Sequence, residues 1–451
     1  MYDVLSENLK KLAAACPYSL YVVGGLVRDF MAGLETDKTD TDICAPAPAE
    51  DFCNRAKQCG FTINAVYKNT GTVKISFGNE EYEFTSFRSD EYVRGEHVPV
   101  NIYFTDDIFL DARRRDFTCN AVYYDIKNRQ FVDPLCGIPD IKSKRIVTVA
   151  PAAKVFGEDG LRLMRLARIS AQTGFQPVAE CLEAARAHRG LIRDVSVERI
   201  TAELNLILHA DGRYGVKLAH YTGLKILKET GILQIILPEL CEGEGIAQRE
   251  DFHKYDVLEH SLRCTAYSDP SIRLAALLHD VGKPCCFKEH GNFFGHETEG
   301  ARIAADVCAR LKVPKKQTEE IVRLTKIHMY DLRGEARENK VRRFIVANYD
   351  IFEKILYIKQ ADYSACRDDF SIAPSVEKFR RIYAKMVEDG VPFTLKQLDI
   401  KGDDLLALGF PPARVGATLE KILNDCCINS VPNERQKLCE WAKKIYLPSV
   451  Q

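Results

Sequence analysis

The pattern of hydrophobic and polar residues divides the chain into a mixed first part and a longer helical part. In the first 149 residues, four stretches predict short β-strands, because apolar residues run together or alternate between turn residues. These stretches are LYVVGG, TVKISFG, EYEFTSFR and RQFVDP. Helical periodicity in LSENLKKLAAAC and AEDFCNRAKQCG falls between them, so this part predicts an α/β head.

Helical periodicity dominates after VTVAPAAKVFGEDG. It is clear in GLRLMRLARISAQTGF, SVERITAELNLILHA and YGVKLAHYTGLKILKETGIL, whereas the acidic, glycine-containing LCEGEGIAQREDFHKYD predicts a linker. The predicted fold class is therefore α+β. Its expected domains are a head over residues 1–148, a helical neck and body over 149–245, a second helical domain over 246–370 and a helical tail over 371–451.

Composition refines this picture mainly by exclusion. The 451 residues exceed what one hydrophobic core holds, and 46% hydrophobic with 28% charged residues is the balance of a folded protein. There is no run of about 18 apolar residues and no signal-peptide layout, so we expect a cytoplasmic protein without a membrane segment. The 16 cysteines show no C-x-x-C spacing, which favours free thiols. A formal net charge of -1 leaves only a local patch for any polyanion.

The first candidate chemistry lies in YVVGGLVRDFMAGLETDKTDTD. A strand that runs into Gly24 and Gly25 lets backbone N–H groups approach a phosphate, and Arg28 adds a forked cationic donor. Asp40 and Asp42 would face one side of an extended segment, where a divalent cation such as Mg²⁺ relieves their repulsion. The segment predicts a metal–nucleotide site, although a paired glycine or a D-x-D motif alone is more often a plain turn.

Two later segments add basic residues. DARRRDFTCNAVYYD holds three consecutive arginines, and FGEDGLRLMRLARISAQTGF carries charged residues every three positions. On a helix beginning at Glu158, the charged residues of the second segment would lie along one side: Asp159, Arg162, Arg165 and Arg168. Either segment alone also fits a solvated charged face.

Together these segments resemble the class II tRNA nucleotidyltransferases, the CCA-adding enzymes, and their relatives the bacterial poly(A) polymerases and the A-adding and CC-adding enzymes. The matching stretches follow the family order over about the first half of the chain: GGLVRD with DTD, RRDFTCNAVYYD, VDPLCGIPDIKSKRI, FGEDGLRLMRLARI and SVERITAEL. The resemblance implies a polymerase-β-like nucleotidyltransferase head in which Asp40 and Asp42 hold two Mg²⁺ ions. It also implies triphosphate-binding residues and a further acidic position: Gly24, Gly25, Arg28 and Arg115, and Glu83. Thr41 departs from the family, which more often has an apolar residue there, and its side chain should face away from the metals.

The resemblance assigns base choice without a template to Asp159 and Arg162. A carboxylate only accepts hydrogen bonds, so Asp159 suits the exocyclic amino group that adenine and cytosine share, and Arg162 suits the adjacent ring acceptor. Guanine and uracil present the reverse pattern, and each mismatched buried polar group costs about 1–3 kcal/mol. Arg165 and Arg168 would brace the site and the phosphates.

A second set of candidate residues lies on predicted helices further along the chain. They are His260, His279, Asp280, His296, His328 and Asp362. Imidazole and carboxylate groups together suit a divalent metal, whereas the alternative is a set of histidines that are hydrogen-bonded within a helical bundle. For His253 and His290, which lie outside the pattern, the second interpretation is the default.

This region resembles the metal-dependent HD phosphohydrolase domain through His260, the His279–Asp280 doublet and Asp362. His296 and His328 match additional histidines of many members. The resemblance implies a phosphatase or phosphodiesterase with a divalent metal whose identity the sequence leaves open.

The preferred prediction is addition of CCA to tRNA 3' ends from CTP and ATP. An A-adding enzyme or a poly(A) polymerase shares every head motif, while the long segment RSDEYVRGEHVPVNIYFTDDIF weighs against a CC-only enzyme. An alternative of another class is an HD phosphohydrolase with an RNA-binding head. The tail PPARVG has Pro412 where relatives often have a glycine, and the sequence fixes neither the role of this tail nor the oligomeric state.

Overall fold

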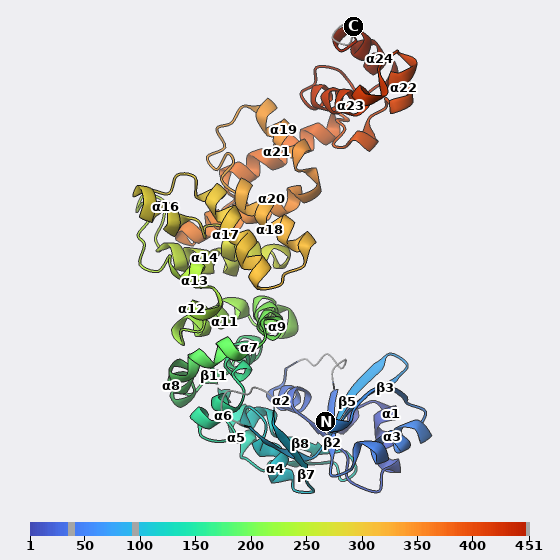
Figure 1. The fold of residues 1–451 in the computed structure, drawn as a ribbon, viewed down its shortest axis with the longest axis vertical. Helices are drawn as coiled ribbons and strands as arrows, with labels where there is room; N and C mark the ends of the chain where they lie inside the picture. Colours follow the sequence, from blue (N-terminus) through green and yellow to red (C-terminus); the bar gives the residue numbers. More distant parts are fainter. Residues whose placement is uncertain (35–40, 93–98, 448–451) are drawn as a thin grey trace. The chain divides into compact units, whose positions relative to one another are not determined.

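The computed structural model of the protein describes residues 1–34, 41–92 and 99–447 (Figure 1). The chain forms two compact units. The first unit comprises Met1–Cys241 with Ala309–Val313, and the second comprises Glu242–Cys308 with the residues from Pro314 onward.

A seven-stranded mixed sheet forms the centre of the head. In spatial order its strands are β3 (Thr62–Tyr67), β4 (Thr72–Phe77), β5 (Glu80–Ser86), β2 (Thr41–Ala45), β1 (Tyr21–Val23), β8 (Tyr123–Asp125) and β9 (Gln130–Val132). The β2–β5 pair is parallel and the other neighbours are antiparallel. Two small sheets pair β6 (Arg88–Glu91) with β7 (Asn101–Phe104) and β10 (Arg145–Ile146) with β11 (Gln176–Pro177).

The described part of the head also contains five helices: α1 (Glu7–Ala15), α2 (Gly25–Ala32), α3 (Ala49–Gln58), α4 (Ile108–Arg113) and α5 (Gly137–Lys142). The spacing of Leu9, Leu12 and Ala13 gives α1 a buried face, and the Ser6 side chain caps its first turn by accepting from Leu9 N–H. Helix α3 packs on β3, β4 and β5, and α2 packs on β1 and β2. The predicted α/β head is confirmed.

A helical neck follows, with α6 (Ala152–Glu158), α7 (Leu161–Thr173), α8 (Ala179–His188), α9 (Val197–Leu208), α10 (Asp211–Tyr214), α11 (Ala219–Glu229), α12 (Leu233–Ile236) and α13 (Pro238–Cys241). Helix α7 packs against both α9 and α11. Helix α11 also lies close to α9, because a Cβ on Gly223 of α11 would lie 2.6 Å from Cγ2 of Ile207 on α9.

The prediction of one helix beginning at Glu158 is wrong. Helix α6 ends at Glu158 and α7 begins at Leu161, so Asp159 and Gly160 form a link between two helices. The carboxylate of Asp159 accepts from the N–H of Leu161 at 3.0 Å, which competes with helix continuation. A Cβ on Gly160 would lie 2.7 Å from the carbonyl oxygen of Leu191, so a tight approach occurs at this link.

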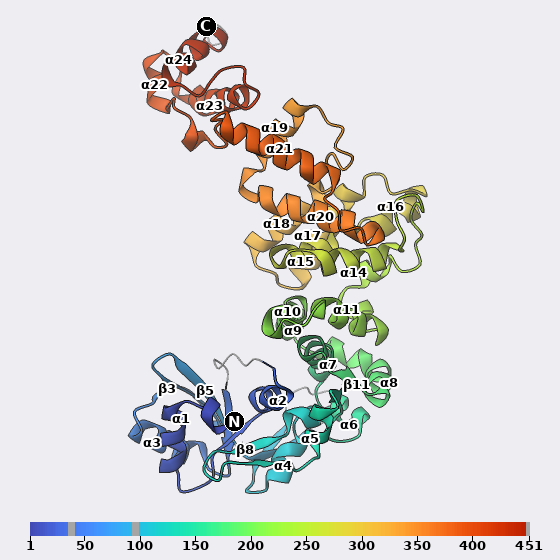
Figure 2. The same cartoon turned by 180° about the vertical axis from the view of Figure 1, so that it is seen from behind.

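The described part of the second unit is helical and contains no strand (Figure 2). Its helices are α14 (Val257–Tyr267), α15 (Arg273–Leu278), α16 (Lys283–His290), α17 (His296–Arg310), α18 (Lys315–Ile327), α19 (Glu338–Ala347), α20 (Phe352–Arg367), α21 (Pro374–Glu388), α22 (Gly402–Ala407), α23 (Pro412–Cys427) and α24 (Arg435–Ile445). Helix α14 packs against α15 and α20, and a separate apolar cluster that includes Leu398, Leu405 and Leu438 holds the last three helices together.

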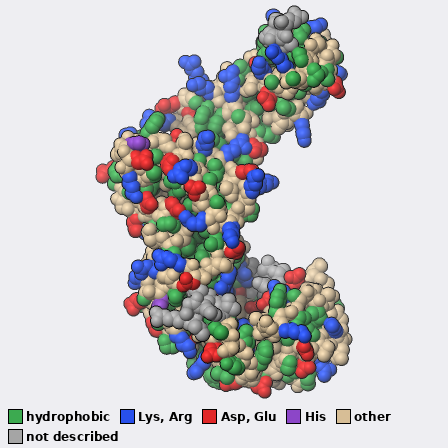
Figure 3. Space-filling view, viewed as in Figure 1, with side chains coloured by type: hydrophobic (Ala, Val, Ile, Leu, Met, Phe, Trp, Pro, Cys, Tyr) green, Lys and Arg blue, Asp and Glu red, His purple; other side chains and the backbone are tan. Residues whose placement is uncertain are grey.

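Surface charge and membrane propensity agree with the composition. On the face drawn in Figure 3, basic and acidic side chains are interspersed over much of the surface. None of the helices in the described ranges has both the length and the apolar character needed to cross a bilayer. All 16 cysteines are free thiols, as predicted.

Candidate functional site

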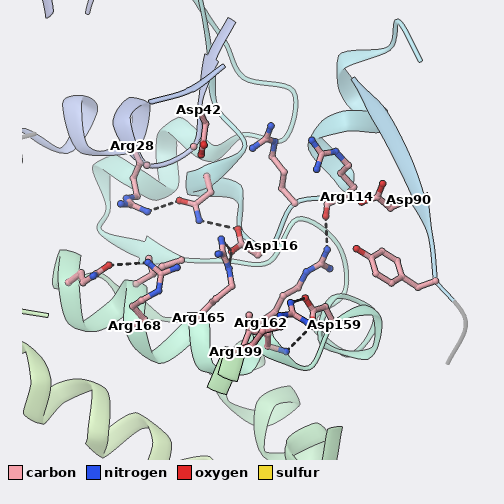
Figure 4. A pocket seen from close by; sticks show the side chains of 18 of the residues that line it. Arg28, Asp42, Asp90, Arg114, Asp116, Asp159, Arg162, Arg165, Arg168 and Arg199 are labelled. Atoms are coloured by element: carbon pink, nitrogen blue, oxygen red, sulfur yellow. Dashed lines mark hydrogen bonds and ion pairs between the residues drawn. The ribbon is translucent and has the colours of Figure 1, made fainter. Parts of the chain in front are cut away.

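The first unit contains an open cavity of 410 Å³ between the head sheet and the neck helices (Figure 4). Among the described residues, nine arginines and four aspartates line it: Arg28, Arg88, Arg114, Arg115, Arg162, Arg165, Arg168, Arg199 and Arg213, with Asp42, Asp90, Asp116 and Asp159. This local excess of positive charge, on a chain whose net charge is -1, suits a polyanion such as a nucleoside triphosphate.

The turn from β1 into α2 brings backbone amides to this cavity. Gly24 has φ +81° and ψ -139°, a conformation that L side chains rarely adopt, and a Cβ there would lie 3.1 Å from Oδ2 of Asp42. Helix α2 begins at Gly25, so its unpaired N–H groups lie at the edge of the cavity. The predicted glycine pair thus lies beside Asp42, one of the two predicted metal-binding carboxylates.

Asp42 and Glu83 are neighbours on parallel strands, because β2 pairs with β5 in the register Asp42 to Glu83. Asp42 is exposed and lines the cavity, whereas Thr41 is buried. Glu83 lies outside the lining residues and forms an ion pair with Lys74 at 3.4 Å. Asp40, the other predicted metal-binding carboxylate, lies outside the described residues.

Arg28 starts a buried hydrogen-bond network that crosses the cavity. It is 5% exposed and donates to Oδ1 of Asp29 at 2.8 Å and to Oδ1 of Asn120 at 2.7 Å. Asn120 donates in turn to Oδ1 of Asp116 at 3.0 Å, and Arg165 donates to Oδ2 of Asp116 at 2.7 Å. Burial alone would raise the pKa of Asp116, but Arg165 and Asn120 outweigh burial and hold that pKa well below its usual value.

Arg115 also lines the cavity, and hydrogen bonds to two neighbouring side chains hold its guanidinium in place. It donates to Oη of Tyr123 and to Oδ2 of Asp111, both at 3.1 Å. The Arg114 side chain donates to the other oxygen of Asp111 at 2.8 Å. Burial opposes ionisation of Asp111, yet Arg114 and Arg115 lower its pKa to about 2. Asp111 is therefore an anionic anchor for two cavity arginines.

The predicted base-reading pair lies on the same cavity wall. Asp159 accepts from Leu161 N–H with Oδ1 and from Arg199 with Oδ2 at 2.7 Å. Arg162 donates to Oε2 of Glu158 at 2.6 Å and to the backbone oxygens of Val155 and Arg114. Both side chains are thus held in fixed orientations.

Arg165 and Arg168 follow Arg162 along α7, as the predicted spacing requires. Arg168 donates to Oε2 of Glu203 at 2.7 Å and to Oε1 of Gln172 at 3.2 Å. Four residues to which no sequence motif assigns a role hold the predicted side chains in place: Asp111, Asn120, Arg199 and Glu203. The signal for Asn120 was available, because it lies inside the RRDFTCN motif.

In the second unit, the structure brings all six predicted histidines and aspartates into one buried cluster. Nε2 of His260 lies 3.2 Å from Nε2 of His279, and 3.3 and 3.1 Å from the carboxylates of Asp280 and Asp362. Nε2 of His296 lies 3.2 Å from Oδ1 of Asp280. These side chains come from five segments of the chain: α14, the end of α15, the start of α17, the end of α18, and α20.

The donor set of this cluster fits a divalent metal. Nδ1 of His279, His296 and His328 faces the backbone oxygens of Ala276, Phe293 and Thr325 at 2.6–2.7 Å, and a carbonyl only accepts, so Nδ1 carries the proton. Each of these rings therefore presents an Nε2 lone pair to the cluster. Both carboxylate oxygens of Asp280 are buried without a hydrogen-bond partner, although Nζ of Lys283 lies 2.6 Å from Oδ2. Lone pairs facing one another around a buried carboxylate call for a cation at the centre.

Three family models match successive segments of the chain. A model of the poly(A) polymerase head domain matches residues 20–147, a model of the probable RNA and SrmB-binding site of polymerase A matches 174–243, and a model of the HD domain matches 257–363. A nucleotidyltransferase head and an HD domain imply binding of divalent metal.

The relatives extend over most of the chain. An A-adding tRNA nucleotidyltransferase of Deinococcus radiodurans is 28% identical over 95% of this chain and 96% of that protein. A multifunctional CCA protein of Legionella pneumophila is 27% identical over 77% of this chain and 85% of that protein. A CCA-adding enzyme of Oceanobacillus iheyensis is 36% identical over 57% of this chain, and the alignment spans 61% of that protein.

A solved structure shares the fold. The Bacillus stearothermophilus CCA-adding enzyme, determined in complex with CTP, aligns with a TM-score of 0.68 over 98% of each chain at 23% identity. The three family matches show that the chain carries a poly(A) polymerase head domain, a region matching the probable RNA and SrmB-binding site of polymerase A, and an HD domain.

Proposed function

We propose that the head adds CMP and AMP from CTP and ATP to the 3' end of tRNA, building the sequence CCA. The observation that carries this proposal is the position of Asp159 and Arg162 on the wall of a cavity lined with arginines. One wall offers a fixed acceptor and a fixed donor, which match the amino group and ring acceptor common to cytosine and adenine. The rest of the cavity offers donors for phosphate.

The chain's own residues bind and orient the nucleotide in this proposal. The N–H groups at Gly24 and Gly25, with the guanidinium groups of Arg28 and Arg115, bind the triphosphate. Asp116 positions Arg165, and Asn120 positions Arg28, so that neither arginine must be ordered when the nucleotide arrives. Such pre-ordered cationic groups are effective for nucleotidyl transfer because the reaction depends on alignment and charge neutralisation.

Asp42, with Asp40 two positions earlier in the sequence, would hold Mg²⁺ at the head site. Carboxylate oxygens are the ligands that Mg²⁺ prefers, and exposed Asp42 beside the glycine turn fits an ion shared with substrate phosphates. When bound, Mg²⁺ supplies activation of the RNA 3'-hydroxyl and neutralisation of the departing pyrophosphate.

Labelled CTP and ATP, offered separately to tRNA that ends at the discriminator base and to tRNA that ends in CC, test the proposal. CCA addition predicts CMP incorporation into the first substrate and AMP incorporation into the second. Incorporation of long A tails into arbitrary RNA would instead identify a poly(A) polymerase.

A second candidate is an A-adding enzyme, which the similarity to the Deinococcus radiodurans protein favours because that alignment covers 95% of this chain. The same assay separates the two candidates. An A-adding enzyme uses ATP on the CC-ended tRNA and leaves CTP unused on both substrates.

We also propose that the HD cluster binds a divalent metal and hydrolyses phosphomonoesters or phosphodiesters. The observation that favours it is the buried carboxylate of Asp280 among four histidine Nε2 atoms. Hydrolysis of p-nitrophenyl phosphate and of 2',3'-cyclic nucleotides by the full chain tests this activity. His279→Ala should abolish hydrolysis and spare nucleotide incorporation.

A cytoplasmic location is expected for an enzyme that acts on tRNA.

A further inference from the structure

His260 differs from the other histidines of the HD cluster in the partner of its second ring nitrogen. His279, His296 and His328 each place Nδ1 within 2.7 Å of a backbone oxygen, which fixes the ring. Among the described residues, Nδ1 of His260 has no hydrogen-bond partner, and the side chain is 0% exposed. A buried ring nitrogen without a partner is costly, so a missing group is expected there.

Two side chains that could bind a metal lie next to this ring and outside the HD set. They are His253, in the segment before α14, and Cys366, near the end of α20. Their ligand atoms and a ring nitrogen of His260 all lie within 4.8 Å of one another. The ring of His253 meets that of His260 edge to face at 4.9 Å, and Nδ1 of His253 is also buried without a partner.

The backbone holds His253 and Cys366 together. The N–H of Lys254 donates to the carbonyl oxygen of Cys366 at 2.8 Å, and the side chain of Arg367 donates to the carbonyl oxygens of Glu250 and Phe252. The segment that carries His253 is therefore fastened to the end of α20. Tetrahedral Zn²⁺ with bonds of about 2.0–2.3 Å needs ligand atoms roughly 3.5 Å apart, so side-chain shifts of about 1 Å suffice.

We propose that His253, His260 and Cys366 form a second metal site. In this site Nδ1 of His260, one ring nitrogen of His253 and the thiolate of Cys366 bind a borderline-soft ion such as Zn²⁺. The thiolate distinguishes it from the HD cluster, whose donors are nitrogen and oxygen. His260 then lies between the two sites, with Nε2 toward the HD cluster. Binding releases the thiol proton of Cys366, and also the ring proton of His260 when both nitrogens hold metal.

Titration of the metal-free full chain with Co²⁺ tests this proposal, because thiolate-to-cobalt charge transfer absorbs in the near ultraviolet and HD ligands give no such band. We expect the band in the wild-type chain at saturation. Cys366→Ser should remove it and one equivalent of bound metal, measured by mass spectrometry of the elements. His253→Ala should weaken Co²⁺ binding at this site by at least about tenfold.

Three control variants separate this site from its surroundings. Cys285→Ser and His290→Ala change a cysteine and a histidine of the same unit that lie outside both sets, and should leave the band unchanged. His279→Ala removes an HD ligand and should also retain the band. Thermal unfolding followed by circular dichroism checks that each variant is folded. No band in the wild-type chain, or an equal band in folded Cys366→Ser, would overturn the proposal.

Discussion

Arg199 on α9 donates a hydrogen bond of 2.7 Å to Oδ2 of Asp159, which lies 40 positions earlier in the link between α6 and α7. The other oxygen of Asp159 accepts from the N–H of Leu161. The carboxylate is thereby fixed from two sides before a nucleotide binds. In the proposed function, this pairing holds the carboxylate in the orientation in which it accepts a hydrogen bond from the base.

Arg199→Ala should therefore reduce selection among nucleotides. The ion pair is part-exposed and contributes modestly, so we expect about a tenfold loss in kcat/KM for CTP and ATP, with a smaller loss for UTP and GTP. Single-turnover incorporation of all four nucleotides measures this. Arg186→Ala, on the exposed face of α8, is the matched control. Unchanged selectivity in Arg199→Ala would contradict a positioning role.

Gly24→Ala should impair catalysis through Asp42. The backbone at Gly24 is strained for any L residue, at about 1–3 kcal/mol, and the new Cβ would press on Oδ2 of Asp42. Displacement of this proposed metal-binding carboxylate by a fraction of an ångström predicts about a tenfold slower incorporation of AMP. Gly33→Ala is the control, because Gly33 also has a positive φ but its Cβ would meet open space. Equal activity of the two variants would refute the contact.

The stability of the head should depend on pH through Asp111. Its folded-state pKa is lowered from 3.8 to about 2, so the ionised form stabilises the fold above pH 3.8, and this contribution is lost as the pH falls toward 2. Asp111→Asn lacks this titration. We expect its destabilisation relative to wild type to be constant between about pH 5 and 7, and to shrink by about 2 kcal/mol as the pH falls to 2.

Calorimetry of the full chain at several pH values measures this difference. Asp106→Asn, an exposed neighbour, is the control and should run parallel to wild type. A difference between wild type and Asp111→Asn that does not change with pH would mean that Arg114 and Arg115 do not stabilise the ionised carboxylate.

Removal of divalent metal should destabilise the second unit. Buried lone pairs that face Asp280 repel one another until a cation binds, so we expect metal to bind the folded chain and not the unfolded chain. Metal at 100 times its dissociation constant should then add about 2.7 kcal/mol to the unfolding free energy. Thermal unfolding with and without a chelator measures the shift. His279→Ala should reduce it, whereas His290→Ala should retain it.

The sequence predicted residues that lie within one motif better than it predicted their partners. The paired glycines, Arg28, and the arginines of α7 were predicted because turn chemistry and helical spacing are local. Glu203 holds Arg168 across 35 positions, and Asp116 holds Arg165 across 49. Such pairs depend on how α7 packs against α9 and on the head sheet, which periodicity alone leaves open.

The helix boundary at Glu158 and the surroundings of His260 are two further features that the sequence pattern did not predict. The sequence pattern of charged residues continues through Gly160, so the interruption is visible only where Leu191 approaches the backbone. The six HD residues were predicted by type and motif, and the fold brings them together. His253 carries no motif, and its approach to Cys366, 113 positions later, results from the packing of α14 against α20.

In the proposed function, Asp42 and the cavity around it are required for the transfer of CMP and AMP to a tRNA 3' end. Labelled CTP, ATP, UTP and GTP, each offered with tRNA to wild type and to Asp42→Asn, test this requirement. We predict incorporation of CMP and AMP alone by wild type, a loss of at least about 100-fold in Asp42→Asn, and undiminished phosphate-ester hydrolysis by that variant. Incorporation by Asp42→Asn at the wild-type rate would contradict the proposed role of Asp42 in nucleotidyl transfer.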